Sequence, residues 1–212
     1  MKKVLVYGDS NTWGDNFITR KRSTSWVDLL KDELSDYSFI CEGLPGRVAG
    51  SLEIDNSYKN GKDTFISVFL SAAPVDIVII ALGSNDLQNK YNRSSREIVK
   101  DLLWYEDIIS DMARVEDNYN RYFKEDKIPE FIYILPTNFE YIEGVFDENS
   151  ELKRQEIISC FRNSDKKIIE VNDMSLVDGL HYSEEGHKKM VKLVKERVCP
   201  KICVNDNLST IK

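Results

Sequence analysis

The sequence has no long hydrophobic run, and this absence limits where the protein is expected to reside. Nowhere in its 212 residues does an apolar stretch approach the roughly 18 residues that a membrane span needs. At the N-terminus only residues 4–7 form an apolar run after Lys2 and Lys3. The core of a secretory signal needs roughly 7–15 apolar residues. We therefore expect a cytoplasmic protein with no membrane partner.

The chain also lacks a surplus of positive charge. Its 36 acidic residues outnumber its 29 lysines and arginines, which gives a net charge of −7. Nucleic-acid binding depends on cationic side chains that neutralise phosphates, and binding to anionic lipid needs a basic face. The charge balance therefore argues against both kinds of partner.

Cysteine is scarce, and its spacing does not suit a metal site. The four cysteines lie at positions 41, 160, 199 and 203, and only the last two are close together, as "CPKIC". A structural zinc site needs a second cysteine pair or nearby histidines, and the chain has only two histidines. We expect no bound metal and, in a cytoplasm, reduced thiols.

What the chain does contain is an alternation of short apolar runs with helix-like stretches. Strands are predicted at residues 3–8, 37–43, 75–83, 130–136 and 166–171. Helices are predicted at residues 25–35, 64–73, 94–123, 148–164 and 183–198, and 49–63 is predicted to be a polar surface loop. Such alternation is typical of parallel sheets, and continuous Val/Ile runs indicate strands that are covered on both faces.

This pattern predicts an α/β fold with one domain over residues 1–212. The domain is a three-layer α/β/α sandwich around a five-stranded parallel sheet, for which a flavodoxin-like strand order of 2-1-3-4-5 is expected. The tail, 204–212, is expected to be loosely held. In such a sheet ligands bind outside the carboxyl ends of the strands, so the residues that follow each strand are the candidates for function.

A serine follows the first predicted strand, and a carboxylate with a histidine follows the last. Ser10 lies in "GDSN", and Asp178 and His181 lie in "DGLH". A serine nucleophile needs a base to take its proton and a third group to orient that base. The other histidine, His187, lies among lysines in the last predicted helix, where a solvated side chain is expected. His181 is therefore the candidate base.

Two further strand exits offer hydrogen-bond donors. Gly46 in "GLPGR" can present an unobstructed backbone N–H, and Asn85 in "GSND" can present a side-chain amide. Acyl transfer needs such donors for the oxyanion of its tetrahedral intermediate. Taken singly, the glycine also fits a turn and the asparagine also fits a helix cap.

The exit segments together resemble the SGNH (GDSL-type) hydrolase superfamily. The matching segments occur in the order typical of the family, over nearly the whole chain: "YGDSNTWG" (7–14), "EGLPGR" (42–47), "LGSND" (82–86) and "DGLHYS" (178–183). The first two look most like the arylesterase and acyltransferase branch. Asn11 and Cys41 depart from the pattern, since many relatives have a leucine and an asparagine at these places.

The resemblance implies a role for each of the five residues. Ser10 is the nucleophile, His181 the general base and then the acid, and Asp178 the residue that orients His181. The oxyanion hole would consist of the Ser10 N–H, the Gly46 N–H and the Asn85 side chain. The family needs neither a metal nor an organic cofactor. Relatives often assemble, so a homo-oligomer stays open.

The predicted function is that of a serine esterase or acylhydrolase that forms an acyl-enzyme on Ser10, acting on small or short-acyl soluble esters. Trp13, Phe139 and Tyr141 can wall a substrate pocket or can simply pack against the core. Arg47 can bind a substrate carboxylate or can pair with an acidic residue of the chain. The sequence leaves these alternatives open.

Two other functions stay under consideration. Flavodoxin-like folds can bind a flavin or nucleotide phosphate at the first strand exit, near a helix start. That function leaves Asp178 and His181 unexplained, and Asp9 would repel a phosphate. The second is deacetylation of an acetylated carbohydrate, which occurs within the same superfamily and which fold analogy does not distinguish from other ester hydrolysis.

Overall fold

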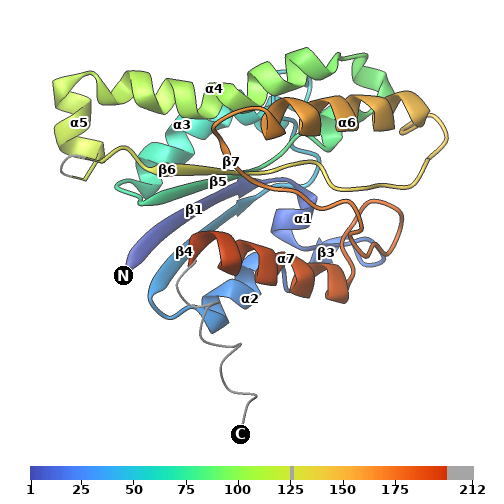
Figure 1. Ribbon diagram of the computed structural model, residues 1–212, viewed down its shortest axis with the longest axis horizontal. Coiled ribbons are helices and arrows are strands. Elements are labelled where there is room, and N and C mark those ends of the chain that lie inside the picture. Colours follow the sequence, from blue (N-terminus) through green and yellow to red (C-terminus); the bar gives the residue numbers. More distant parts are fainter. Residues whose placement is uncertain (125–126, 200–212) are drawn as a thin grey trace, which may run out of the picture.

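A parallel sheet of five strands forms the middle layer of the protein. The computed structural model describes residues 1–124 and 127–199. The strands are β1 (Lys2–Gly8), β4 (Tyr37–Gly43), β5 (Ile77–Ala81), β6 (Glu130–Ile134) and β7 (Lys167–Ile169). Their order across the sheet is β4-β1-β5-β6-β7, and all pairs are parallel (Figure 1). Counted along the chain this order is 2-1-3-4-5, so the predicted topology is confirmed.

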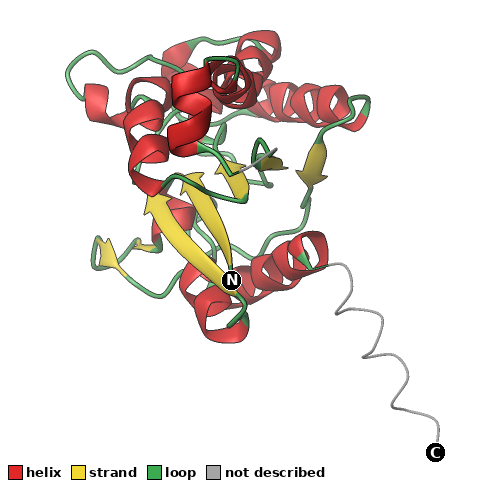
Figure 2. Ribbon diagram, turned by 90° about the vertical axis from the view of Figure 1, so that its left-hand side faces the viewer, coloured by secondary structure: helices red, strands yellow, loops and turns green. Residues whose placement is uncertain are grey.

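Helices cover both faces of this sheet. They are α1 (Ser10–Trp13), α2 (Trp26–Glu33), α3 (Gly61–Ala72), α4 (Ser95–Ala113), α5 (Glu116–Tyr122), α6 (Glu148–Arg162) and α7 (Glu184–Val198). Helices α3 to α6 lie on one side and α2 with α7 on the other, so the three layers are visible in both ribbon views (Figures 1 and 2). None of the helices in the described residues is long and apolar enough to cross a membrane.

The first strand shows why the sheet is buried on both faces. Val4 and Val6 pack in the cluster under α2 and α7, whereas Leu5 and Tyr7 pack in the cluster under α3, α4 and α6. Successive side chains of a strand point to opposite faces, and here both faces are covered. All four side chains are fully buried. The rigid strand therefore ends in a fixed position, at the turn that carries Ser10.

Several local details differ from the predicted elements. The helix predicted over 94–123 is broken at residues 114–115 into α4 and α5, and this break lets Phe123 stack on Tyr119 and reach Phe69. The predicted loop 49–63 contains a 3-10 turn, η1 (Ser57–Lys59), and the first turn of α3. Two similar turns, η2 (Asn85–Leu87) and η3 (Asn89–Tyr91), follow β5. Cys203 and the tail 204–212 lie outside the described residues.

A small antiparallel strand pair lies outside the main sheet and was not predicted. It consists of β2 (Asp15–Asn16) and β3 (Lys21–Arg22), directly after α1. Its strands are only two residues long, too short to leave a periodic pattern in the sequence. The pair extends the turn that carries Ser10 and places Asp15 in a buried position.

The prediction that His187 is solvated is wrong. The side chain faces inward from α7 and is buried, and its Nδ1 accepts a hydrogen bond of 3.2 Å from the backbone N–H of Trp26. Its ring also lies edge-on to that of Tyr182, with centroids 5.6 Å apart. Burial lowers the pKa of His187 to about 4. The imidazole is therefore neutral near neutral pH and joins the start of α2 to α7.

Replacing His187 by glutamine should make the stability of the protein less sensitive to acid. The folded-state pKa of about 4 lies below the roughly 6.5 expected for the unfolded chain, so stability is lost as pH falls through this window. At pH 5 the contribution of His187 should be about 2 kcal/mol less favourable than at pH 7. Glutamine can still accept from Trp26 and takes up no proton.

The measurement is denaturant unfolding of both proteins at pH 7 and pH 5. Burial raises the pKa of Asp9 to about 6. The contribution of Asp9 to stability therefore falls as pH rises from 5 to 7, whereas that of His187 rises. Asp9 is present in both proteins, so its effect cancels in the difference. The same loss of stability in the wild type and in His187→Gln would contradict the assignment.

Candidate active site

The turn after β1 presents Ser10 at the edge of the sheet. Asp9 caps α1, because its Oδ1 accepts a hydrogen bond of 3.0 Å from the Asn11 backbone N–H. Gly8 is required for space, since a Cβ there would lie 2.1 Å from Oγ1 of Thr12. Ser10 is the first residue of α1 and is 6% exposed. The sequence "GDS" thus forms a tight strand-to-helix turn with the hydroxyl near its outer end.

The structure brings His181 and Asp178 to this hydroxyl. Nε2 of His181 lies 3.1 Å from Oγ of Ser10, and Nδ1 lies 2.7 Å from Oδ2 of Asp178. An ionised carboxylate only accepts hydrogen bonds, so Nδ1 carries the ring hydrogen and Nε2 is left as an acceptor for the serine hydroxyl. The three residues, which were predicted from two separate strand exits, therefore form one continuous chain of hydrogen bonds.

The other oxygen of Asp178 holds the loop that carries it. Oδ1 accepts from the backbone N–H groups of Leu180, at 3.1 Å, and His181, at 2.7 Å. Burial alone would raise the pKa of Asp178, but the hydrogen bonds and charge of His181 outweigh it and leave the pKa below its usual value. Asp178 is therefore ionised near neutral pH, as an orienting group must be.

The two predicted oxyanion donors lie next to each other. Nδ2 of Asn85 donates a 3.0 Å hydrogen bond to the carbonyl of Arg47, the residue after Gly46. The loop that contains them is joined to the nucleophile turn, since the backbone N–H of Leu44 donates to the Gly8 carbonyl at 3.1 Å. Within the described residues the Gly46 N–H has no acceptor. It is available to a ligand.

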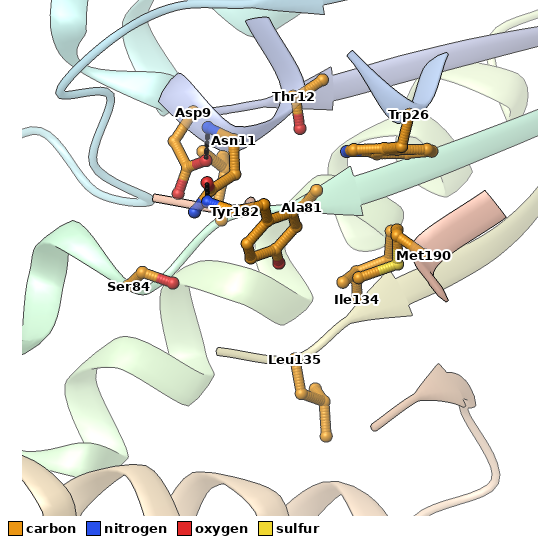
Figure 3. Close-up of a pocket in the computed structure, with 11 residues that line it drawn as sticks. Asp9, Asn11, Thr12, Trp26, Ala81, Ser84, Ile134, Leu135, Tyr182 and Met190 are labelled. Atoms are coloured by element: carbon orange, nitrogen blue, oxygen red, sulfur yellow. Dashed lines mark hydrogen bonds between the residues drawn. The ribbon is translucent and has the colours of Figure 1, made fainter. Parts of the chain in front are cut away.

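Asn11 has a role that the sequence did not reveal. Its side-chain amide donates to the carbonyl of Leu180 at 3.3 Å and accepts from the N–H of Tyr182 at 2.9 Å. These are the backbone groups on either side of His181. Figure 3 shows the Asn11 side chain between Asp9 and Tyr182. Asn11 thus clamps the histidine loop onto the nucleophile turn, a contact across 171 residues that no local pattern indicates.

The sequence left open whether Arg47 binds a substrate carboxylate or pairs with an acidic residue, and the structure shows backbone carbonyls among its partners. The side chain is buried, and its Nη1 donates to the carbonyls of Gly8, at 2.9 Å, and Glu42. The guanidinium lies over the ring of Tyr7, 4.1 Å from its centroid. These contacts hold the loop 42–47 against β1. Arg47 therefore supports the loop that carries Gly46.

The predicted aromatic residues are divided between the core and the surface. Phe139 stacks on the buried Phe146, with centroids 4.7 Å apart, and packs against the core. Tyr141 is 64% exposed, and Trp13 is half-buried at the end of α1. The loop of Phe139 and Tyr141 contacts the histidine loop, because the Glu140 N–H donates to the Gly179 carbonyl at 2.7 Å.

A cavity of about 10 Å³ lies against Asp9, Asn11 and Tyr182, and it is too small for a substrate (Figure 3). Across residues 1–124 and 127–199 no group of three or more His, Cys, Asp or Glu side chains is placed to hold a metal ion.

Comparison with known proteins gives the family. The chain matches the family model GDSL-like Lipase/Acylhydrolase over residues 4–194. The chain belongs to this family. Membership in the GDSL-like Lipase/Acylhydrolase family confirms the resemblance seen in the sequence and the predicted class of enzyme, a carboxylic ester hydrolase. No curated protein matches the chain significantly in sequence.

Solved structures support the fold of this GDSL-like protein. A carbohydrate acetylesterase family member from Sinorhizobium meliloti has a TM-score of 0.74 and 24% identity, covering 93% of this chain and 99% of that one. The native aryl esterase of M. smegmatis has a TM-score of 0.77 and 21% identity, covering 93% and 98%. A G-D-S-L family lipolytic protein from Veillonella parvula has a TM-score of 0.63 and 15% identity, covering 95% and 100%.

Replacing Asn11 by alanine should slow turnover without weakening substrate binding. Both hydrogen bonds that position the backbone around His181 are lost, and at about 1 kcal/mol each this predicts a fall in kcat of about tenfold or more. Asn11→Asp keeps the acceptor for the Tyr182 N–H and should recover part of the rate. The readout is kcat and KM on p-nitrophenyl acetate, with Asn163→Ala on the surface as the control.

If Asn11 positions the loop, kcat should be highest in the wild type, lower in Asn11→Asp and lowest in Asn11→Ala, while KM changes little. Equal kcat values in all three folded proteins would show that the clamp does not matter.

Proposed function

We propose that the protein is a serine esterase in which Ser10 is acylated by small or short-acyl esters. The observation that carries this proposal is the chain of hydrogen bonds from Ser10 Oγ through His181 to Asp178, with distances of 3.1 and 2.7 Å. A serine hydroxyl is a weak nucleophile unless an adjacent base takes its proton, and this arrangement supplies such a base.

The first half of the reaction acylates the enzyme. Oγ of Ser10 attacks the ester carbon while its proton passes to Nε2 of His181, and Asp178 stabilises the imidazolium that forms. The carbonyl oxygen becomes an oxyanion. The imidazolium then returns the proton to the alkoxy oxygen, the carbon–oxygen bond breaks and the alcohol leaves. In the second half water takes the place of the alcohol and releases the acid.

The oxyanion would be stabilised by donors that are already in place. The Ser10 and Gly46 N–H groups supply two of them. The amide of Asn85 has two hydrogens, and its bond to the Arg47 carbonyl engages only one. The same bond holds the amide group in position, which agrees with the need for donors that are fixed before charge develops.

The scope of the reaction is proposed from what surrounds the site. No lid-sized segment is inserted at the strand exits within the described residues, which favours small, water-soluble esters with short acyl groups. A cytoplasmic location stays a prediction of the sequence. The flavin- or nucleotide-binding alternative is disfavoured, because the buried carboxylate of Asp9 lies under the turn that would receive a phosphate.

Replacing Ser10 by alanine should abolish most of the activity. Loss of the nucleophile predicts a fall in kcat on p-nitrophenyl acetate on the order of 10³-fold or more. A fluorophosphonate probe, followed by mass spectrometry, should label Ser10 in the wild type and nothing in the variant. Ser159→Ala, on the exposed surface of α6, is the matched control and should behave as the wild type.

Turnover by Ser10→Ala at the wild-type rate, or a probe adduct on another residue, would overturn the proposal.

Replacing Asn85 by alanine tests the oxyanion donors separately from the nucleophile. Removal of one such donor typically lowers kcat about 10²- to 10³-fold. KM should change little, because the donor acts on charge that develops after binding. Gln88→Ala removes the side chain that donates to Oδ1 of Asn85 and is the structural control. If both variants lose activity equally, Asn85 holds the loop and is not an oxyanion donor.

A further inference from the structure

A second carboxylate lies beside the catalytic histidine. Oδ2 of Asp15, at the start of β2, is 3.8 Å from Nε2 of His181, the same nitrogen that faces Ser10. The Asp15 side chain is only 3% exposed, and no group in the described residues donates a hydrogen bond to its carboxylate. Its remaining ionic partner is Arg20, at 3.6 Å, whose own side chain is 67% exposed.

This carboxylate has unused capacity to accept hydrogen bonds. Among the described residues, the fully buried side-chain atoms without a partner are Oγ1 of Thr12 and Nε of Arg47. The oxygens of Asp15 are not among them, so they keep some accessible surface that a donor can reach. His181 does not supply the missing donor in the free enzyme. Its ring hydrogen is on Nδ1 and is donated to Asp178, so Nε2 has no hydrogen to give to Asp15.

Asp15 also lines a cavity that Val177 and Tyr182 line as well. This cavity, of about 480 Å³, lies between the β2–β3 pair and the start of α7. Its volume falls in the range typical of small-molecule sites. Hydroxyl groups of Ser23 and Thr24 line it together with the apolar side chains of Phe17 and Val177. Asp15 therefore lies between His181 and a space large enough for part of a substrate.

We propose that Asp15 accepts a hydrogen bond from a hydroxyl on the alcohol part of the ester, and that the adjoining cavity holds this alcohol. The substrate class is then monoesters of diols and polyols. The inference rests on the proposed function, because it needs His181 to deliver a proton to the leaving oxygen.

The position of the leaving oxygen supports this assignment. To receive its proton, that oxygen must come within hydrogen-bond distance of Nε2 of His181. Asp15 lies 3.8 Å from the same nitrogen. A hydroxyl on the second carbon from the leaving oxygen, as in a monoester of a 1,2-diol, is thereby brought to Asp15, and hydrogen bonds to a carboxylate are among the stronger ones.

The ion pair with Arg20 argues for a neutral hydroxyl over a cationic alcohol. The guanidinium at 3.6 Å offsets part of the negative charge of Asp15 but leaves its lone pairs available. A cationic group would gain less from a carboxylate that is already paired. An anionic group at this place would be repelled.

The test compares esters that differ only in the group facing Asp15. 2-Hydroxyethyl acetate has a hydroxyl where propyl acetate has a methyl group. The kcat/KM of the wild type should be about tenfold or more higher for the hydroxyl ester. In Asp15→Ala the ratio should fall to near one, and Asp15→Asn, which keeps an acceptor, should retain part of it. Asp111→Asn, on α4, is the matched control.

A second pair, acetylcholine and 3,3-dimethylbutyl acetate, measures any preference for a cation. If Asp15→Ala changes only this pair, the carboxylate binds a cation and the proposal is wrong. If the variant slows all four esters equally, Asp15 acts on the imidazolium of His181 and the proposal is also wrong. The same hydroxyl-to-methyl ratio in the wild type and in Asp15→Ala overturns it as well.

These outcomes are distinct from failure of the proposed function. Probe labelling and p-nitrophenyl acetate turnover test Ser10 without any hydroxyl on the alcohol. A wild-type enzyme that fails both the probe labelling and the p-nitrophenyl acetate assay overturns both proposals. An enzyme that is active in them but shows no preference for the hydroxyl ester overturns only the proposal on Asp15. Thermal unfolding of Asp15→Ala and Asp15→Asn establishes that each variant is folded.

Discussion

The hydrogen bond between His181 and Ser10 joins two residues that are 171 positions apart in the chain, and the rest of the site depends on it. Ser10 follows β1, whereas His181 comes after β7, and β5 and β6 lie between these strands. Three strand spacings of about 4.8 Å separate the two exits by about 14 Å. The chain that leaves β7 must therefore cross the edge of the sheet before His181 can reach the serine.

Side chains from neighbouring exits hold that crossing segment in place. Asn138, after β6, binds both backbone groups of Met174, at 2.5 and 3.1 Å. The N–H of Val177 donates to the carbonyl of His181 at 2.9 Å, which closes the loop on itself. Asn11 then binds the peptide groups beside His181. A loop that was free to move would lose the geometry that a base needs, and these contacts restrict it from three sides.

A buried ion pair plays the same part for Gly46 and Asn85, the proposed oxyanion donors. Asp86, next to Asn85, accepts from the Ala49 N–H at 2.7 Å and from Arg93 at 2.6 Å. Asp86 is fully enclosed, and removal of either partner would leave an uncompensated buried group. The pair fixes η2 against the segment that follows Gly46. Donors from two separate strand exits are thereby kept in register with each other.

The sequence was sufficient to predict an element of the fold where a single local feature determines that element. Continuous Val/Ile runs predict buried strands. The helices predicted over 25–35 and 183–198 are present, and Ser25 and Ser183 cap them by accepting hydrogen bonds from the N–H groups of Asp28 and Gly186. It failed where the outcome depends on a distant neighbour. His187 looked solvated because its sequence neighbours are lysines, yet the residue it meets is Trp26, 161 positions away. The partners of Arg47 were not readable for a similar reason, because one of them is the carbonyl of Gly8, 39 positions away.

The polar side chains of the site use one atom to hold their own position and another to contact a neighbour or a substrate. This explains why the type of reaction was easier to predict than the substrate. Asp178 gives one oxygen to the backbone and the other to His181, and Asn85 gives one amide hydrogen to the Arg47 carbonyl. Each group thus fixes its own position with one atom and leaves another for the reaction. Such residues are needed by any ester hydrolysis on this fold, so their spacing is readable. Asp15 has no such structural partner in the backbone, and its neighbourhood appears only once the chain is folded.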